Sequence, residues 1–237
     1  MKSLNIFTDA SIAQSDKYGT VGCAGFISAI GDPENLNLRL KTLDKDYTIV
    51  LDSTNNISEA TAVLKAVQYA IANRYGYDQI NIFSDSQWCI RSLTTWIFNW
   101  ISTIDKAGVM YSSSGNPVLN QNLLAEIICA IAFSNTPIHF YHCKGHVKND
   151  SASIYEALKI FRMSNHVPRD ISLTYNQIYI MAYYNNIVDT ESREIAKAFC
   201  NGDVYTRLPY HIEYPRPYYY ILNRDIIEVY KSLISKA

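Results

Sequence analysis

Glycine, proline and charged residues are all sparse in this sequence of 237 residues: it holds 9 Gly and 7 Pro, and 18% of its residues are charged. This composition excludes collagen-like and low-complexity chains, and with 48% hydrophobic residues it is typical of an ordinary globular protein. The net charge of −1 excludes a uniformly basic surface, so affinity for a long polyanion would need a local basic patch.

Long apolar runs and paired cysteines are also missing. No apolar run approaches the roughly 18 residues of a membrane-spanning helix, and the N-terminus lacks the basic-then-apolar pattern of a signal peptide. The five cysteines form no CxxC pair and show no regular spacing. We therefore expect a cytoplasmic protein without membrane contact, in which Cys23, Cys89 and Cys129 are small core residues in a reducing compartment.

Tyrosine, by contrast, is abundant, with 19 residues. Tyrosine fills cores and interfaces, or it offers a stacking surface to nucleic-acid bases. Most of these residues lie in otherwise apolar segments, which favours the first role. Trp96 and Trp100, one helical turn apart, are interpreted in the same way.

The order of apolar runs predicts a mixed α/β sheet. Strands are expected first, at Leu4–Phe7, Val21–Ala29, Leu36–Leu43 and Tyr47–Leu51. Strands then alternate with helices: a helix capped by Ser58 and ending near Arg74, a strand Gln79–Phe83, a helix Asn120–Phe133, a fifth core strand Pro137–His142, and a last amphipathic helix Asp225–Ile234. For Ile171–Tyr184 the pattern does not decide between helix and strand.

Acidic residues stand at the ends of several of these elements. They are Asp9 and Asp85 after strands, Glu59 in the expected first turn of a helix, and Asp189 before a helical segment. A carboxylate at the edge of an apolar core is costly unless it has a partner, although the helix dipole alone could favour Glu59. We predict that the four converge on a divalent-metal site that cuts a phosphodiester, where two Mg²⁺ ions about 3.5–4 Å apart ionise the water and neutralise the leaving oxygen.

Separated motifs resemble, in the family's order, the signature stretches of type 1 ribonuclease H. They are TDAS at Thr8–Ser11, TNNISEATAVLKAV at Thr54–Val67, IFSDSQ at Ile82–Gln87 and HCKGH at His142–His146. WIFNW at Trp96–Trp100 and NPVLN at Asn116–Asn120 resemble the segments that flank the family's substrate-binding handle. The resemblance covers residues 1 to about 146 and resumes at NNIVD, Asn185–Asp189.

The resemblance implies a ribonuclease H-like fold, a five-stranded mixed sheet flanked by helices. We expect a catalytic domain at residues 1–200 that contains a helical insertion at 147–184, and a tyrosine-rich C-terminal extension at 201–237. The implied function is endonucleolytic hydrolysis of the RNA strand of RNA–DNA hybrids, with 5′-phosphate and 3′-hydroxyl products. A nuclease of the same fold that acts on DNA or structured RNA, and a catalytically silent hybrid-binding module, stay open as alternatives, and the oligomeric state is not indicated.

The resemblance also implies the role of each site residue. Asp9 would bridge two Mg²⁺ ions, with Mn²⁺ as an alternative; Glu59 and Asp85 would hold the ion near the leaving group, and Asp189 the ion that activates water. His146 would assist proton transfer or product release. The expected substrate-binding residues are Asn55, Asn56 and Gln87 in the hybrid's minor groove, and Thr54 and Asn120 at a DNA-strand phosphate. Each of these could instead cap a helix or fill a turn.

The sequence also departs from the family pattern. The glycine-rich turn after the first Asp is here SIAQSDKYG, and the handle segment, Ile101–Gly115, holds a single lysine, Lys106. The basic residues that could compensate, or form only a solvated face, are Lys144, Lys148, Lys159, Arg162 and Arg169. Asp150 and Asp170 compete with Asp189 as the fourth carboxylate. Zinc at His142, Cys143 and His146 is disfavoured because no second ligand pair appears at structural spacing.

Overall fold

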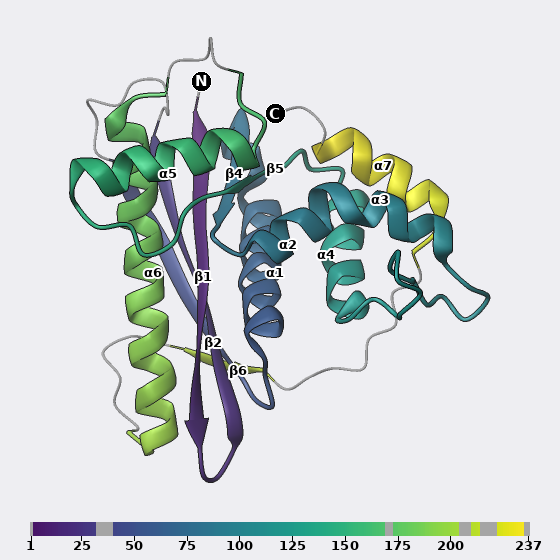
Figure 1. Cartoon of the computed structure of the whole chain (residues 1–237), viewed down its shortest axis with the longest axis horizontal. Helices are drawn as coiled ribbons and strands as arrows, with labels where there is room; N and C mark the ends of the chain where they lie inside the picture. The colour runs from purple at the N-terminus through teal and green to yellow at the C-terminus, as the bar shows by residue number, and fades with distance from the viewer. Residues whose placement is uncertain (1, 32–39, 169–172, 204–209, 214–221, 235–237) are drawn as a thin grey trace.

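The computed structural model describes residues 2–31, 40–168, 173–203, 210–213 and 222–234. A twisted mixed sheet runs through the middle of the molecule (Figure 1). Its strands are β1 Ser3–Ser15, β2 Gly19–Gly31, β3 Lys41–Val50, β4 Gln79–Ser84, β5 His139–His142 and β6 His211–Glu213, in the order β5-β4-β1-β2-β3-β6. β1, β2 and β3 form an antiparallel meander, whereas β4 and β5 extend it in parallel on the β1 side.

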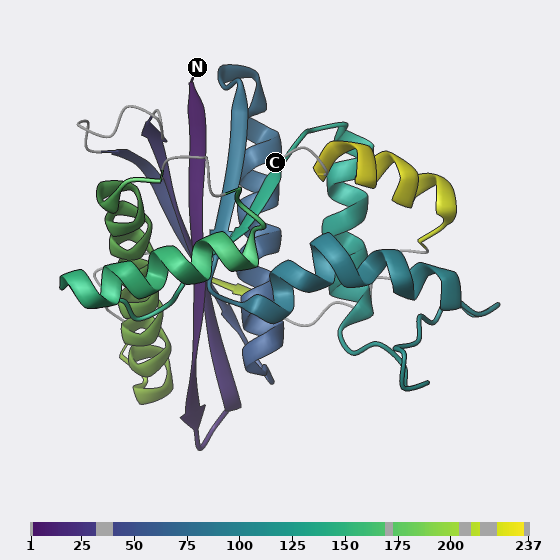
Figure 2. The same cartoon turned by 45° about the horizontal axis from the view of Figure 1, so that its top comes forward.

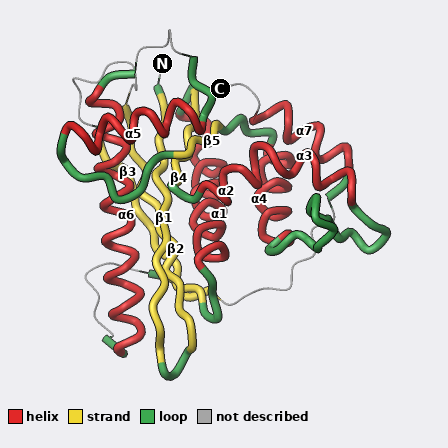
Figure 3. The backbone as a smooth tube through the Cα atoms, in the orientation of Figure 1, coloured by secondary structure: helices red, strands yellow, loops and turns green. Residues whose placement is uncertain are grey.

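Seven α-helices occupy the described residues. They are α1 Asn55–Asn73, α2 Gln87–Arg91, α3 Ile97–Trp100, α4 Gln121–Ser134, α5 Ser151–Ser164, α6 Tyr175–Asn201 and α7 Arg224–Ile234. A π-helical turn at Ser92–Trp96 joins α2 to α3, and a 3₁₀ turn at Ile101–Thr103 follows. Figure 3 shows the helices on both sides of the sheet, and the long loop that joins α3 to α4 projecting away from it.

Successive side chains of each strand point to opposite faces of the sheet, and each face has its own hydrophobic core. Leu4 and Ile6 point to the side covered by α1, α4 and α7, whereas Phe7 points to the side covered by α5 and α6. On the second side, the rings of Tyr184, Phe7, Phe83, Tyr141 and Phe161 stack in succession from α6 across the sheet to α5, with neighbouring centroids 4.9–5.8 Å apart. Period-two alternation therefore fixes which helices lie on which face.

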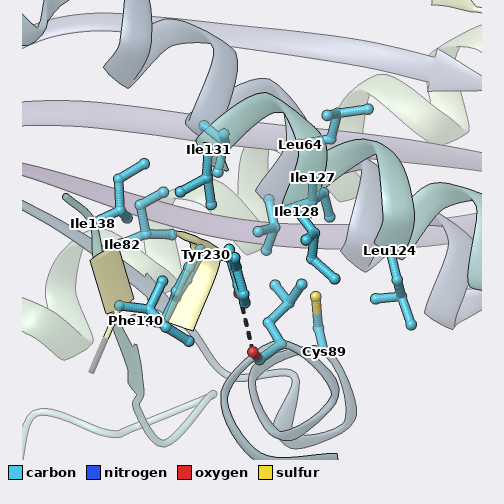
Figure 4. Close-up of a cluster of buried hydrophobic side chains, with 14 of the residues drawn as sticks. Leu64, Ile82, Cys89, Leu124, Ile127, Ile128, Ile131, Ile138, Phe140 and Tyr230 are labelled. Atoms are coloured by element: carbon cyan, nitrogen blue, oxygen red, sulfur yellow. Dashed lines mark hydrogen bonds between the residues drawn. The ribbon is translucent and has the colours of Figure 1, made fainter. Parts of the chain in front are cut away.

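The C-terminal helix α7 closes the first core against α4. Its Tyr230 is fully buried, and the hydroxyl donates a hydrogen bond to the Leu93 carbonyl at 3.0 Å, shown as the dashed line in Figure 4. Leu233 and Ile234 are buried on the same face of the helix. A final amphipathic helix was expected at Asp225–Ile234, and α7 confirms it with one more residue at its start.

Most expected elements are present, but several of their boundaries differ. In the described residues the sheet has six strands instead of the expected five, because β6 adds a short strand beside β3. A single strand, β3, replaces the two expected at Leu36–Leu43 and Tyr47–Leu51, and residues 36–39 lie outside the described part. Helix α1 begins at Asn55 because Thr54, not Ser58, is the N-cap: its side chain accepts from the Ile57 amide.

The segment expected as an insertion is helical where it is described. Helix α5 lies within it, and α6 begins at Tyr175 and continues without a break past residue 184 to Asn201. The Thr174 side chain and Gln177 form a reciprocal cap at the start of α6, so the helix is well defined there. Ile171 and Ser172 lie outside the described residues, and from Tyr175 on the undecided segment is helix.

Candidate active site

Three acidic side chains meet where β1, β4 and α1 come together. Asp9 lies on β1 beside β4, Asp85 follows the last residue of β4, and Glu59 lies in the second turn of α1. One carboxylate oxygen from each lies within 4.8 Å of the other two. The prediction that these three converge is confirmed, although Glu59 is a turn further along its helix than expected.

Burial and mutual repulsion make full ionisation of this acidic triad costly. Desolvation, followed by the nearby Asp85 carboxylate, raises the pKa of Asp9 well above its ordinary value. Burial and the charges of Asp9 and Asp85 raise the pKa of Glu59 in the same way, and burial raises the pKa of Asp85. Glu59 Oε2 is buried and has no hydrogen-bond partner among the residues that the structure describes. Such an atom in an acidic cluster fits a site completed by a cation.

A neutral amide lies between two of these carboxylates. Asn185 is fully buried on α6, and its Nδ2 donates to Asp9 Oδ2 at 3.0 Å and to Asp85 Oδ2 at 3.5 Å. Its Oδ1 accepts from the Cys143 thiol at 3.5 Å. We expected Asn185 only as a marker of Asp189, four residues later. The signal that could have revealed its contact is this spacing, because residues i and i+4 share one face of a helix.

Asp189 lies one helical turn further along α6, next to Arg193 and His146. Its carboxylate accepts from Arg193 at 2.5 and 2.7 Å, and His146 Nδ1 lies 3.3 Å from Asp189 Oδ2. The Ser11 hydroxyl lies 3.5 Å from Asp189 Oδ1. Asp189 thus lies at the same site but outside the tight triad, and Arg193 is a neighbour that sequence reasoning missed.

Of the two other candidates for the fourth carboxylate, the structure describes Asp150, which lies away from the triad. Asp150 caps α5, where it accepts from the Ser153 amide at 2.8 Å, and it is exposed. Asp170 lies outside the described residues. The role of Asp189 as the fourth metal ligand stays a prediction, and the structure gives Asp150 a different task.

The HCKGH segment connects β5 to this site. His142 Nε2 lies 3.2 Å from the Asp85 carbonyl, and Gly145 lies so close to Asp85 that a Cβ there would be 2.0 Å from Oδ2. His146 is exposed, in a left-handed backbone conformation with φ 53°. The His142 ring and the Cys143 thiol contact groups of the acidic site, and in the described part of the chain only the triad groups three such ligands together.

Four of the five expected substrate-binding residues stand at the start of the two helices next to the triad. Thr54 caps α1, Asn55 and Asn56 open it, and Gln87 opens α2 directly after Asp85. Among the described residues, the side chains of Asn55, Asn56 and Gln87 make no hydrogen bond. Asn120 precedes α4 with φ 57°, and its side chain does not cap that helix. Of the five expected substrate-binding residues, only Thr54 uses its side chain to cap a helix, so helix capping explains one of them.

Comparison with known proteins identifies the family. The model of the family described as RNase H matches residues 1–155, more than half of the chain. The chain belongs to the ribonuclease H family. Family membership confirms the resemblance carried by the sequence motifs and the expected fold, and Asp9, Glu59 and Asp85 all lie within the matched region.

Several bacterial ribonucleases H are similar to this chain. Ribonuclease HI of Haemophilus influenzae is 32% identical over 157 residues, which are 66% of this chain and 87% of that protein. Ribonuclease H of Actinobacillus succinogenes is 34% identical over 145 residues, 61% of this chain and 79% of that protein. The match to ribonuclease H of Tropheryma whipplei is 36% identical but spans 58% of that protein.

Among solved structures, the PFV RNase H domain aligns with 70% of this chain and 96% of its own length, at 18% identity and a TM-score of 0.48. LC9-RNase H1, a type 1 RNase H with the type 2 active-site motif, aligns with 81% of this chain and 85% of its own chain, at 16% identity and a TM-score of 0.45.

The structure bears on two further expectations, the absence of a membrane-spanning helix and the state of the cysteines. No helix in the described ranges is both long and apolar enough to cross a membrane. All five cysteines are free, and Cys23, Cys89 and Cys129 are buried as expected.

Proposed function

We propose that this ribonuclease H hydrolyses the RNA strand of RNA–DNA hybrids with the help of two divalent cations, Mg²⁺ or Mn²⁺. The observation that carries the proposal is the buried acidic triad, which forms no ion pair with a lysine or arginine in the described part of the chain. A binding module would gain nothing from three carboxylates that raise one another's pKa. A reducing, cytoplasmic setting is proposed with it, supported by the five free thiols.

The residues present fit a site for hard cations. All donors of the triad are carboxylate oxygens, which suit Mg²⁺, and in the described part of the chain Glu59 Oε2 is buried without a partner. Asp9, Glu59 and Asp85 would hold the ions, together with Asp189 from α6. When bound, the ions would lower the pKa of the attacking water and neutralise the charge of the leaving oxygen.

The chain's own groups prepare this site. The Asn185 amide holds the Asp9 and Asp85 carboxylates side by side although they repel each other. His146 is exposed next to Asp189, where a neutral imidazole can accept a proton and an imidazolium can give it to the product. Its left-handed backbone and exposure suit a group that meets the substrate from the outside.

Substrate selection is assigned to polar groups rather than to strong positive charge. Asn55, Asn56 and Gln87 carry unused amides beside the triad, which can read 2′-hydroxyls and base edges in the wide minor groove of an A-like duplex. Thr54 and Asn120 would hold a phosphate of the DNA strand. In the handle segment, Asp105 accepts from the Ala107 and Val109 amides and from the Tyr111 hydroxyl, so it organises this loop with Lys106 as its one cation.

A cleavage assay with four labelled substrates tests the proposal. RNA–DNA hybrid, double-stranded RNA, double-stranded DNA and single-stranded RNA are incubated with the protein in Mg²⁺, Mn²⁺ or EDTA. We expect cleavage of the RNA strand of the hybrid alone, lost in EDTA and in Asp85→Asn. Metal-dependent cleavage of another duplex would assign the site to a different nuclease, and hybrid binding without cleavage would support a silent module.

The same assay tests the fourth carboxylate. Asp189→Asn should lose most of the activity, whereas Asp150→Asn, a matched change at the exposed cap of α5, should keep it because asparagine caps helices as well as aspartate does. Loss of activity in Asp150→Asn with full activity in Asp189→Asn would reverse the assignment.

A further inference from the structure

The side chain of Asn165 meets the outer edge of β5 at the last residue of the strand. β5 ends the sheet and pairs with β4 on one side only, so its other side presents unpaired backbone groups. Asn165, the residue after α5, meets them: its Oδ1 accepts from the His142 amide at 2.7 Å, and its Nδ2 donates to the His142 carbonyl at 2.8 Å. One amide thus gives His142 both hydrogen bonds that a neighbouring strand would give.

Asn165 is itself fixed in place by α5. Its Nδ2 also donates to the Phe161 carbonyl at 2.8 Å, and its backbone amide donates to the same carbonyl at 3.1 Å. The Phe161 ring stacks on Tyr141 of β5 with centroids 5.8 Å apart. In Figures 1 and 2, α5 lies across the strands next to β5. The position of α5 therefore sets the position of the last residue of β5.

His142 connects the end of β5 to Asp85 of the acidic triad through a hydrogen bond. Its ring is buried, and Nε2 lies 3.2 Å from the Asp85 carbonyl. Because a carbonyl only accepts hydrogen bonds, Nε2 carries the proton and donates it there. Asp85 connects β4 to α2 and has no regular strand or helix geometry of its own. The His142 bond thus fixes the backbone from which the Asp85 carboxylate extends.

Other contacts tie the same loop to α5 and α6. Lys144 forms an ion pair with Glu156 of α5 at 2.8 Å, and Asn186 of α6 donates to the Val147 carbonyl at 2.8 Å. The family match ends at residue 155, so Asn165 and the last turns of α5 lie beyond the matched region. This part of the chain has no role in the function proposed above.

We propose that Asn165 and His142 are positioning residues for Asp85: α5 holds the end of β5 through Asn165, and His142 holds the Asp85 backbone. The inference rests on the proposed function, since it assigns the segment a role in that catalytic centre. Helix α5 contributes no group to the chemistry and acts through the placement of one carboxylate.

Matched variants separate positioning from general stability. His142→Phe removes the donor and keeps a ring, whereas His142→Gln keeps an N–H near the position of Nε2. Asn165→Leu removes the amide and keeps its approximate shape. Tyr230→Phe is the control, because it also removes one buried side-chain hydrogen bond to a backbone carbonyl, but that carbonyl belongs to Leu93 and not to a residue of the acidic triad. For each protein we would measure the unfolding midpoint in urea, kcat and KM on the hybrid, and the rise in Tm with Mg²⁺.

We expect His142→Phe to lower kcat by about 10- to 100-fold with KM nearly unchanged, as for a catalytic group displaced by a fraction of an ångström. His142→Gln should recover most of kcat, Asn165→Leu should change in the direction of His142→Phe, and Tyr230→Phe should keep the wild-type kcat. Wild-type kcat in His142→Phe, an equal loss in His142→Gln, or an equal loss in Tyr230→Phe would overturn the proposal.

The metal readout distinguishes a failure of this inference from a failure of the proposed function. If the wild type cleaves no hybrid, the proposed function is wrong, and the Tm rise with Mg²⁺ still decides the inference. A smaller rise in His142→Phe than in His142→Gln and the wild type would support it. An equal rise in all three proteins, or no rise in the wild type, would overturn it.

Discussion

Gly145 offers a test of how closely the HCKGH loop packs on the acidic triad. A Cβ added at Gly145 would lie 2.0 Å from Asp85 Oδ2, 3.0 Å from Cγ and 3.2 Å from Cβ of the same residue. Carbon and oxygen do not approach closer than about 3 Å without strain, so Gly145→Ala must displace the Asp85 carboxylate or the loop by about 1 Å. A shift of that size at a catalytic group costs about 100-fold in rate.

The matched control is Gly76→Ala, because no atom lies within 4 Å of a Cβ at that exposed position. Both variants would be compared with the wild type in single-turnover cleavage of the hybrid and in urea unfolding. We expect Gly145→Ala to lose about 100-fold in rate and about 1–3 kcal/mol in the free energy of unfolding, as overpacking does. Gly76→Ala should change neither. Wild-type rates in Gly145→Ala would refute the close packing of this loop on Asp85.

Three further predictions concern metal linkage, salt and the core. In EDTA the free energy of unfolding should fall as pH rises above the ordinary carboxyl range. The reason is that burial and repulsion raise the pKa values of Asp9, Glu59 and Asp85, so the folded state binds more protons there than the unfolded state. Urea midpoints measured from about pH 5 to pH 8 should show this fall without Mg²⁺ and a smaller fall with it. Hybrid affinity, measured by fluorescence anisotropy in EDTA, should depend weakly on salt, and Lys106→Ala should reduce the logarithmic slope by at most about 1. Tyr230→Phe should lose about 1–2 kcal/mol because the Leu93 carbonyl loses its donor, and an unchanged urea midpoint would contradict this.

The sequence predicted the elements whose pattern is local. The alternation in Leu4–Phe7 and the helical spacing of α4 are visible within a few residues, and both elements are present. The start of α1 was misjudged because Thr54 and Ser58 are both good caps, and burial decides between them. Ser58 is buried and shares a hydrogen bond with Ser53 at 2.7 Å, which leaves Thr54 to cap the helix.

The residues of the site that belong to a family motif could be predicted from the sequence, whereas contacts that depend on packing could not. Asp9, Glu59 and Asp85 each belong to a motif, and the structure brings them together. The contact of Asn165 has no motif, because it depends on how α5 lies on the sheet. Sequence separation hides such pairs: Asn165 meets His142 across 23 residues, and only the fold sets their distance. Arg193, by contrast, pairs with Asp189 at i,i+4 within α6, a spacing that the sequence alone could have indicated.

The two parts of the site differ in how their charge is balanced, and α6 accounts for the difference. One turn of this helix places the neutral amide of Asn185 between Asp9 and Asp85, and the next turn places Asp189 within reach of Arg193 and His146. Asp189 is thus already compensated by the Arg193 guanidinium, whereas in the described part of the chain the acidic triad accepts hydrogen bonds from neutral donors of the backbone and Asn185. Because attraction for a divalent cation grows with uncompensated charge, the triad is the stronger attractor, and Asp189 must exchange Arg193 for an ion before it can serve as a ligand. A straight, unbroken α6 is what keeps these two environments one helical turn apart.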